Sequence, residues 1–436
     1  MKSRALFALS MILVGAPFAS AGAQDELRAE INADYKANLA TLFDYFHRNP
    51  ELSRREFNTS ERLGAEIRAL GFDVTQKVGG TGVVAVMRNG AGPTIMIRAD
   101  MDGLPVKEAS GLSYASLATQ EDIDGEVKPV MHACGHDTHM TALVGAARAL
   151  AARKDQWKGT LVLIGQPAEE RISGARAMME DGLYKRFPKP DYALAFHVSA
   201  SHPSGKIEVP LVAGSSSDSV DIIVHGVGAH GAAPNKGVDP VLVASQIVVS
   251  LQSIVSRSIE PLQPGVITVG AIHGGSKHNI IGDKVHMQLT VRSNDPDVRL
   301  QLLDGIDRVA EGVAVSMGVP KNLMPEVIRS PSETTPPTVN DAATVEIFKK
   351  TFTEHFGADK LIDMKPEGMG AEDFAYFVTP ESGVKGLYFV VGGTPEKDLK
   401  TAPSHHSPFF KVEPEPAIKS ATEAMVVGAM RLFNGE

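Results

Sequence analysis

The densest group of chemically active side chains in this sequence lies at residues 132–139. The segment reads His-Ala-Cys-Gly-His-Asp-Thr-His, so it holds three imidazoles and the only cysteine of the chain. A thiolate and neutral imidazoles are the ligands that borderline-soft metal ions such as zinc prefer. We therefore interpret Cys134 and His136 as metal ligands, whereas His132 and His139, taken singly, are better explained as structural residues.

Polar residues also follow two apolar runs that read as buried strands. Glu169 and Glu170 come after the run at 161–164, and His197 comes directly after the run at 192–196. In open α/β sheets, ligands bind just beyond the carboxyl ends of the strands. Adjacent side chains there point in different directions, so one glutamate can coordinate a metal while its neighbour faces the reacting water.

Further candidates lie near both ends of the chain. Asp100 and Asp102 close another apolar run, where a carboxylate can orient a ligand imidazole without itself binding the metal. His405 and His406 form a histidine pair in a turn, and spacing alone leaves open which of them is a ligand. The acids at 370–374 follow a glycine-rich turn, where a helix N-cap is an equal explanation.

The first residues have the pattern of a secretory signal peptide. Lys2 and Arg4 precede an apolar run at 5–14, and small residues follow up to Ala23. The run is too short to span a bilayer, so we expect a leader over residues 1–23 and a secreted, periplasmic protein. A single cysteine excludes an intrachain disulfide, and in an exported protein it needs burial or a metal to protect it.

Composition limits the classes of function. The chain has 436 residues, with 43% hydrophobic and 22% charged residues, which is typical of globular proteins with two or three domains. Its net charge of −9 becomes more negative when the leader is removed, and no basic stripe is present. We therefore expect no nucleic-acid partner, and no membrane association after the leader is cleaved.

The order of apolar patterns predicts an α/β catalytic domain with an insertion. Four short apolar runs predict buried strands of a mostly parallel sheet, at 94–97, 161–164, 192–196 and 387–391. Helical patterns at 25–70, 140–150 and 174–179 alternate with them. The discontinuous catalytic domain is predicted at 24–213 and 320–436.

The middle of the chain predicts a separate α+β, ferredoxin-like unit over residues 214–319. Its pattern is a strand, a helix, two strands and a second helix, at 218–224, 240–255, 265–272, 284–292 and 298–317.

Together these motifs resemble the hippurate hydrolase and indoleacetyl-amino-acid hydrolase family. That family is the amidohydrolase branch of the aminoacylase and carboxypeptidase-G superfamily of co-catalytic zinc metallopeptidases. The matching motifs run in order through nearly the whole chain after the leader: Arg98-Ala99-Asp100-Met101-Asp102-Gly103-Leu104-Pro105, 132–139, Gln166-Pro167-Ala168-Glu169-Glu170, Ala229-His230-Gly231-Ala232-Ala233-Pro234, 370–374 and His406-Ser407-Pro408.

The resemblance implies a complete metal site. Glu169 would be the general base, and His406, directly before Ser-Pro, would be the ligand of the histidine pair. The implied ligands of two divalent ions, with Cys134 bridging them, are Cys134, His136, Glu170, His197 and His406. A thiolate disfavours Mg and Ca, so the ions are expected to be Zn, Mn, Co or Ni.

The resemblance also implies that the inserted unit is a lid that forms a homodimer. His230 and Asn279 of the lid would reach towards the substrate, with His230 stabilising the oxyanion, and Arg292 is a candidate for binding the substrate carboxylate. The chain departs from the family after Asn279, because it reads Ile-Ile-Gly where family members usually carry a proline.

The expected activity is cleavage of the amide bond of N-acyl amino acids by a metal-activated water. A dipeptidase or aminopeptidase of the same superfamily is the nearest alternative. A cysteine hydrolase using Cys134 would leave the two glutamates and His197 without a role. A periplasmic metal- or substrate-binding protein without turnover would have no need of Glu169 beside a ligand.

Overall fold

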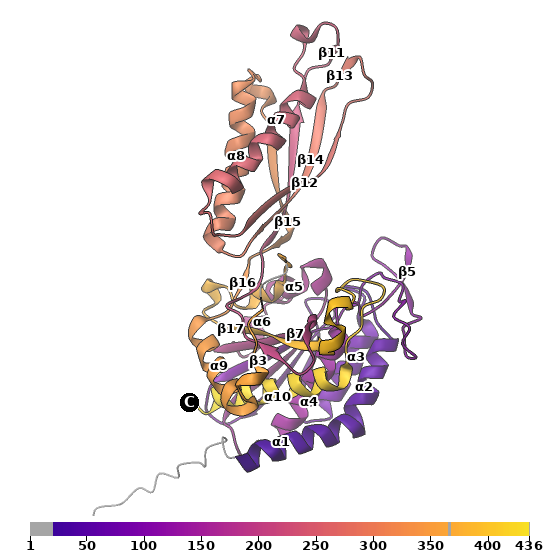
Figure 1. Cartoon of the computed structure of the whole chain (residues 1–436), viewed down its shortest axis with the longest axis vertical. Helices are drawn as coiled ribbons and strands as arrows, with labels where there is room; N and C mark the ends of the chain where they lie inside the picture. The colour runs from indigo at the N-terminus through magenta and orange to yellow at the C-terminus, as the bar shows by residue number, and fades with distance from the viewer. Residues whose placement is uncertain (1–20, 365–367, 436) are drawn as a thin grey trace, which may run out of the picture.

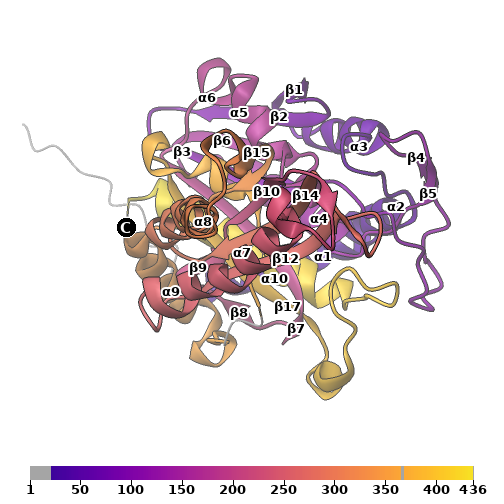
Figure 2. The same ribbon diagram turned by 90° about the horizontal axis from the view of Figure 1, so that it is seen from above.

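We analysed a computed structural model of the chain, which describes residues 21–364 and 368–435. Residues 1–20, which make up most of the predicted signal peptide, lie outside the described residues. Figure 1 shows a rounded body that contains both ends of the described chain, with an elongated lid standing on it. Figure 2, seen from above, places the lid helices over the middle of the body sheet.

The body is built on a seven-stranded sheet in the order β1-β2-β6-β3-β7-β17-β8. Its four central strands, β6, β3, β7 and β17, run parallel, and these are the four strands predicted from apolar runs. The strands at both sides pair antiparallel. The bounds are β1 (Asp73–Val78), β2 (Gly82–Asn89), β3 (Thr94–Asp100), β6 (Gly159–Gln166), β7 (Tyr192–Pro203), β8 (Ile207–Glu208) and β17 (Lys385–Thr394).

Helices cover both faces of this sheet. Alternate residues of its strands point to opposite sides, so each face carries an apolar core. Ile95 and Ile97 of β3 belong to the core on one face, whereas Met96 belongs to the core on the other. The first face carries α1 (Ala21–Asp34), α2 (Ala40–Arg48), α3 (Phe57–Arg68), α4 (His136–Ala152), α9 (Ala342–Phe356) and α10 (Pro414–Phe433). The second face carries α5 (Gly174–Glu180), α6 (Leu183–Arg186) and the short helix η7 (Asp373–Phe377).

The helical region predicted at 25–70 is three helices. A short π-helix at Tyr35–Leu39 joins α1 to α2, and a non-helical segment separates α2 from α3. Pro50 ends the second helix, because a proline disfavours helical backbone in the residue before it.

The lid is a four-stranded antiparallel sheet, in the order β12-β14-β10-β15, with two helices packed against it. Its elements follow one another as strand, helix, strand, strand, helix, strand, which is the ferredoxin-like order. They are β10 (Ser217–His225), α7 (Pro240–Ser253), β12 (Gly265–Gly274), β14 (Lys284–Ser293), α8 (Pro296–Ser316) and β15 (Glu326–Thr335).

The lid extends beyond the boundary predicted at residue 319. β15, the fourth strand of its sheet, pairs with β10 from Ser217 to Ile223. The predicted boundary leaves this segment in the catalytic domain because β15 is an edge strand with mostly exposed side chains, so it lacks the apolar alternation of a half-buried strand.

A narrow connection joins the lid to the body. The strands β9 (Val212–Gly214) and β16 (Thr338–Val339), which enter and leave the lid, pair antiparallel with each other. Just above them, Asp218 accepts two hydrogen bonds from the Arg299 guanidinium, at 2.7 and 2.8 Å, and one from Thr334. Two further hairpins complete the fold, β4 (Thr119–Glu121) with β5 (Val127–Pro129) in the body and β11 (Ala229–His230) with β13 (Ile280–Ile281) at the far end of the lid.

One helix of the lid is strongly apolar. The segment Pro240–Ser258, which contains α7, is by length and composition long and apolar enough to cross a membrane. Its inner residues, among them Val243 and Ile247, form part of the lid core. On its outer side Leu242 and Val249 remain exposed.

Candidate active site

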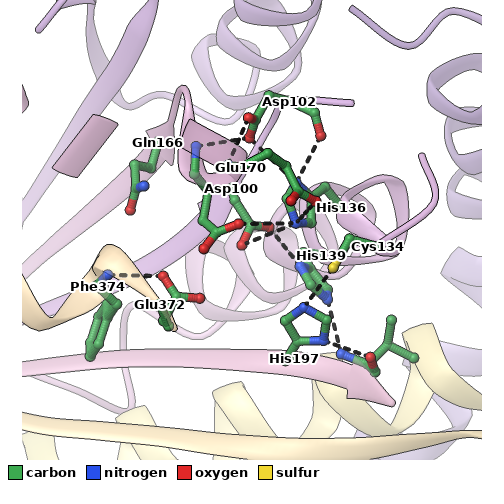
Figure 3. A network of polar contacts seen from close by, with 12 residues as sticks. Asp100, Asp102, Cys134, His136, His139, Gln166, Glu170, His197, Glu372 and Phe374 are labelled. Carbon is green, nitrogen blue, oxygen red and sulfur yellow. Dashed lines mark hydrogen bonds and ion pairs between the residues drawn. The ribbon is translucent and has the colours of Figure 1, made fainter. Parts of the chain in front are cut away.

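The predicted chemical residues meet at the carboxyl edge of the parallel sheet. Figure 3 shows Cys134, His136, Glu170 and His197 facing one another at the point where the strands end. Gly135 makes the close approach possible, because a Cβ atom at this residue would lie 2.4 Å from a methyl carbon of the Val198 side chain. Its φ of 87° is also a backbone conformation that favours glycine, and it starts α4 against β7.

The ligand atoms form overlapping groups rather than one ring. In each group the atoms lie within 4.8 Å of one another, so a single cation could contact all of them. Cys134 belongs both to a group with Glu170 and His406 and to a group with His197 and His405. A third group joins Glu170 to His136 and Glu169. The five predicted ligands are therefore brought together, with the thiol shared between groups.

When neutral, two of the imidazoles direct an unprotonated nitrogen at this site. Nδ1 of His136 lies 2.8 Å from the Asp102 carbonyl oxygen, and Nδ1 of His197 lies 2.6 Å from that of Val198. A carbonyl can only accept, so both rings carry their proton on Nδ1. Nε2 of His136 is then a buried lone pair without a hydrogen-bond partner. Nε2 of His197 lies 3.4 Å from the Cys134 sulfur.

Two other imidazoles are turned the opposite way. Nε2 of His139 accepts a hydrogen bond from the Val198 backbone N–H at 2.9 Å, and Nε2 of His405 accepts one from the Ala200 N–H at 3.1 Å. A backbone N–H can only donate, so the proton of each neutral ring is on Nδ1. These Nδ1–H groups face Asp100 at 2.6 Å and the Cys134 sulfur at 3.7 Å. Neither ring offers a lone pair to a metal.

The positions of their ring nitrogens separate the two members of the histidine pair, His405 and His406. His406 places Nε2 3.3 Å from a Glu170 carboxylate oxygen, with its side chain 56% exposed to the cavity side. Its backbone N–H donates to the Ala133 carbonyl at 2.9 Å, which fixes the turn beside the metal-ligand segment. The geometry therefore favours His406 as the ligand, whereas His405 is held by the backbone of β7. His132 lies below the site, buried and with neither ring nitrogen hydrogen-bonded.

Asp102 positions the two adjacent glutamates. Its carboxylate accepts hydrogen bonds from the backbone N–H groups of Glu169, at 3.1 Å, and Glu170, at 3.0 Å. The preceding residue, Ala168, has a φ of 50°, a conformation that L-residues adopt only when contacts hold it. A buried carboxylate of Glu56 accepts from the Ala168 N–H at 2.8 Å and provides that contact. Sequence analysis gave no signal for Glu56.

Asp100 lies beside the predicted ligand His136, but its hydrogen bond goes to another imidazole. The carboxylate that the sequence analysis placed behind a ligand imidazole hydrogen-bonds to His139 rather than to His136, whose Nε2 lies 3.7 Å away. Its other oxygen accepts from the fully buried Arg98 at 2.7 Å. The backbone of Asp102 orients His136 instead.

Burial and mutual repulsion raise the pKa values of the acidic groups at the site. Burial raises the pKa of Glu169 well above its usual value, and the charges of Glu372 and Glu170 raise it further. Burial likewise raises the pKa of Glu170 to about 8, although His136 opposes this. The pKa of the Cys134 thiol is raised well above its usual value by burial and by both glutamates.

A cation fits this site on three observations. Burial alone lowers the pKa of His136, but Asp100 and Asp102 raise it to about 10, so the protein itself draws a positive charge to the Nε2 position. Oε1 of Glu170 and Nε2 of His136 are both buried without a hydrogen-bond partner, 3.8 Å apart. The thiolate, imidazole and carboxylate set matches the preference of borderline divalent metals.

Of the acids predicted near residue 372, Glu372 has the helix-capping role that the sequence left open. Glu372 caps the helix η7 by accepting from the Phe374 N–H at 2.9 Å. Its carboxylate also accepts from Arg98 at 2.7 Å and from the Tyr388 hydroxyl at 2.6 Å. Arg98 thus ties the end of β3 to the segment that follows the lid.

A cavity of about 780 Å³ opens in front of these groups. Its wall combines Glu169, Glu170 and His406 of the body with Arg292 and Asn294 at the base of the lid. Arg292 is half-buried, and burial lowers its pKa. Among the described residues, no carboxylate lies within ion-pair distance of its guanidinium, which hydrogen-bonds instead to the Met369 carbonyl at 3.4 Å. The cavity therefore contains an unpaired positive charge.

His230 and Asn279 lie outside this cavity. They occupy the hairpin β11–β13 at the end of the lid away from the body, so in a single chain they do not reach the metal-ligand groups. Within one chain, His230 therefore does not reach the cavity, and its predicted action at the site stays a prediction. Nδ1 of His230 accepts from the Ala232 N–H at 3.0 Å, which leaves Nε2–H exposed as a donor.

The fold and the site together define a metal-dependent hydrolase. The chain belongs to peptidase family M20/M25/M40, whose sequence model matches residues 96–428. Members of this family are hydrolases of amide bonds, and the expectation from the sequence motifs is confirmed.

Several curated proteins are similar to most of this chain. Thermostable carboxypeptidase 2 of Saccharolobus solfataricus is 37% identical over 83% of this chain and 88% of its own length. Hippurate hydrolase of Campylobacter jejuni is 35% identical over 79% and 86%. N-acetyl-L-cysteine deacetylase of Bacillus subtilis is 34% identical over 89% and 87%.

A solved structure agrees with the arrangement of both domains. A Bacillus subtilis protein described as a dinuclear metal-binding peptidase of the M20 family superposes with a TM-score of 0.74 and 25% identity, covering 94% of this chain and 99% of that one. The match spans body and lid together. It supports a site for two metal ions in this fold.

The Asp102 carboxylate generates a testable expectation for metal affinity. In Asp102→Asn an amide NH₂ faces one of the two backbone N–H groups, so the loop carrying Glu169 and Glu170 loses an acceptor. We expect metal affinity to fall by about 10- to 100-fold, as measured by competition with a chelating dye. Ser53→Ala is the matched control, because it removes only a hydroxyl donor to Asp102. Equal affinity in Asp102→Asn and the wild type would contradict this role.

A buried ion pair docks the N-terminal helices onto the metal-ligand helix. His47 of α2 lies 2.7 Å from Asp137 through Nδ1 and 3.2 Å from Glu108 through Nε2. Burial lowers the pKa of His47, but these two carboxylates outweigh it and raise the pKa to about 9. Asp137 adjoins the ligand His136, so this pair fixes the start of α4.

The pair predicts a pH dependence of stability with a definite sign. A histidine whose pKa rises on folding stabilises the protein fully below its unfolded pKa of about 6.5, and this stability is lost as the pH rises through about 9. We expect His47 to contribute on the order of 3 kcal/mol near pH 6 and little near pH 10. Urea unfolding of the wild type and His47→Gln at both pH values measures it. A difference that does not change with pH would refute the charged pair.

Proposed function

We propose that the protein hydrolyses the amide bond of N-acyl amino acids that carry a free carboxylate. The observation that carries the proposal is that one cavity combines the buried Glu169, beside the metal-ligand groups, with the guanidinium of Arg292, for which the described residues provide no carboxylate partner. The first is suited to proton transfer and the second to an anionic substrate end. The relatives named hippurate hydrolase and N-acetyl-L-cysteine deacetylase support this substrate class.

The metal-ligand groups would hold two divalent cations. These groups are Cys134, His136, Glu170, His197 and His406, with the thiolate shared. Bound there, the cations would supply Lewis acidity, which lowers the pKa of a water from about 15.7 towards 7 and polarises the scissile carbonyl. Zn, Mn, Co or Ni suit a site with a thiolate, whereas Mg and Ca do not.

Glu169 would move the proton. Its carboxylate is buried and lies 3.9 Å from Nε2 of His136, so it faces the position where the attacking water would be held. It would accept a proton from that water and deliver it to the nitrogen of the leaving amine. Burial raises its pKa, which makes the protonated carboxyl a persistent donor in the second step.

Arg292 would bind the carboxylate of the amino-acid half. A half-buried guanidinium without a carboxylate partner recognises a carboxylate by two parallel hydrogen bonds. The relative named a carboxypeptidase favours a second substrate class with the same anionic end, namely peptides cleaved at their C-terminal residue. An aminopeptidase would instead need an acid placed for a free amino group.

His230 would act in a second copy of the chain. Its exposed Nε2–H lies at the end of the lid that is away from its own cavity. The apolar outer face of α7, with Leu242 and Val249, is suited to a homodimer formed through the lids. In such a dimer the tip of one lid would complete the cavity of the other copy and stabilise the oxyanion.

We also propose that the protein is exported to the periplasm, because residues 1–23 have the composition of a secretory leader. Mass spectrometry of the protein recovered from the periplasm of a bacterial host should give an N-terminus near Gln24. Recovery of the full-length chain from the cytoplasm would exclude export in that host.

Substitutions of the two adjacent glutamates should have different effects on metal content and turnover. Glu169→Gln should retain both metal ions and lose about 10²- to 10⁴-fold in turnover of N-benzoylglycine, because only proton transfer is removed. Glu170→Ala should lose bound metal, as elemental analysis would show. Full activity in Glu169→Gln, or full metal content in Glu170→Ala, contradicts the roles assigned here.

Arg292 should discriminate between two substrates that differ only at the carboxylate. Arg292→Met should lower kcat/KM for N-benzoylglycine by about 10- to 100-fold, the value of a charge-assisted hydrogen bond, and leave N-benzoylglycinamide unaffected. Arg292→Lys is the control that keeps the charge. If both substrates are affected equally in Arg292→Met, the carboxylate is bound elsewhere.

Complementation tests the action of His230 across a dimer. Glu169→Gln and His230→Ala chains should each be nearly inactive alone. Mixed dimers should regain activity, since one of their two cavities would have an intact Glu169 and receive an intact His230 from the other chain. A monomer in sedimentation experiments, or mixtures as inactive as the separate variants, would show that His230 does not act in this way.

A further inference from the structure

His405 contacts the thiol of the metal site without offering it a lone pair. Its Nδ1 lies 3.7 Å from the Cys134 sulfur, while its Nε2 accepts the Ala200 N–H at 3.1 Å. The family motif includes the following histidine but not this one. His405 is therefore an imidazole at the metal site that the proposed chemistry does not use.

The proton position follows from the partners on either side of the ring. The Ala200 N–H belongs to β7, and a backbone N–H has no lone pair, so Nε2 must be unprotonated. A neutral imidazole has one N–H, which must then be Nδ1–H, the nitrogen that faces the sulfur. The contacts of the two ring nitrogens thus determine which of them carries the proton.

The ring is also prevented from turning over. It packs against His197 with ring centroids 5.2 Å apart and against Phe410 with centroids 4.7 Å apart. The backbone of the next residue, His406, is fixed by its hydrogen bond to the Ala133 carbonyl. A ring turned over about its Cβ–Cγ bond would place the carbon atoms Cε1 and Cδ2 where Nε2 and Nδ1 now lie, so it would lose both the Ala200 bond and the N–H that faces the sulfur.

We propose that His405 donates a hydrogen bond from Nδ1 to the Cys134 thiolate and thereby limits the electron density that this sulfur gives to the metal pair. The inference rests on the metal site of the proposed function. His405 acts through Cys134 and is a positioning residue, not a ligand.

The chemistry of the surroundings explains why such a donor is useful. Glu169 and Glu170 both place negative charge near the sulfur, which makes the thiolate a stronger base. Hydrogen bonds to a metal-bound sulfur lower its electron donation and tune the metal, and partners outside the ligand set commonly have this role. A thiolate shared between two cations needs to bind both without holding either too strongly.

Cobalt(II) provides a direct readout, because a cobalt thiolate has a sulfur-to-metal charge-transfer band whose energy follows the electron density on sulfur. The comparison uses the wild type, His405→Leu and His405→Asn, each loaded with cobalt and checked for cobalt content. In the leucine variant the donor is absent, so the band should shift to longer wavelength. The asparagine variant keeps an N–H in the place of Nδ1–H, so its band should stay near that of the wild type.

Other outcomes overturn the proposal. An unmoved band in His405→Leu with full cobalt content means that the N–H makes its bond elsewhere, for example to the backbone carbonyl of Cys134. Loss of one cobalt ion per chain in His405→Leu means that His405 is a ligand. A wild-type protein that binds cobalt without any sulfur band removes Cys134 from the site, and then the metal site of the proposed function fails as well.

A measurement on the unaltered protein guards against variants that do not fold. The ring nitrogens of ¹⁵N-histidine-labelled wild-type protein report the tautomer of each imidazole by NMR, with His405 assigned from the asparagine variant. We expect the Nδ1–H tautomer for His405. The Nε2–H tautomer would contradict the donor role regardless of how the leucine variant behaves.

Discussion

Negative charge held out of water is the constraint on which the rest of this structure depends. Two adjacent glutamates and a thiol share a buried pocket, where burial raises the pKa of all three groups and the glutamates raise the pKa of the thiol further. Arg98 offsets the acids beneath the site, where it pairs with Asp100 and Glu372, but it does not reach the thiol. Ionised groups are rarely buried without a compensating charge, so the pocket is stable in its ionised form only with cations.

The fold meets this constraint by fixing each group from the backbone. The parallel strands bring Asp100, the two glutamates and His197 to one edge, and the close approach at Gly135 adds the ligands of α4. Backbone carbonyls and N–H groups of β7 and of Asp102 then decide which nitrogen of each neutral imidazole is protonated. The ligand side chains are thus oriented before any metal binds, and Arg292 at the base of the lid adds a positive charge to the cavity.

Much of this arrangement follows from sequence, because strand ends in a parallel sheet must lie close together. The runs before Asp100, Glu169 and His197 gave the sheet and its functional edge. What depends on contacts distant in sequence was not predictable. The role of His405 requires the Ala200 N–H, and that of Glu56 requires the Ala168 N–H. β15 was missed because an exposed edge strand has no apolar alternation, and the position of His230 depends on how far the lid extends.

The central claim is that two cations compensate the buried acids by sharing Cys134. Crystals of the protein loaded with zinc or manganese, measured at the absorption edge of the metal, test it most directly. The account predicts two anomalous peaks per chain in the pocket, both in contact with the Cys134 sulfur. A single peak, or peaks away from Cys134 and Glu170, would contradict it.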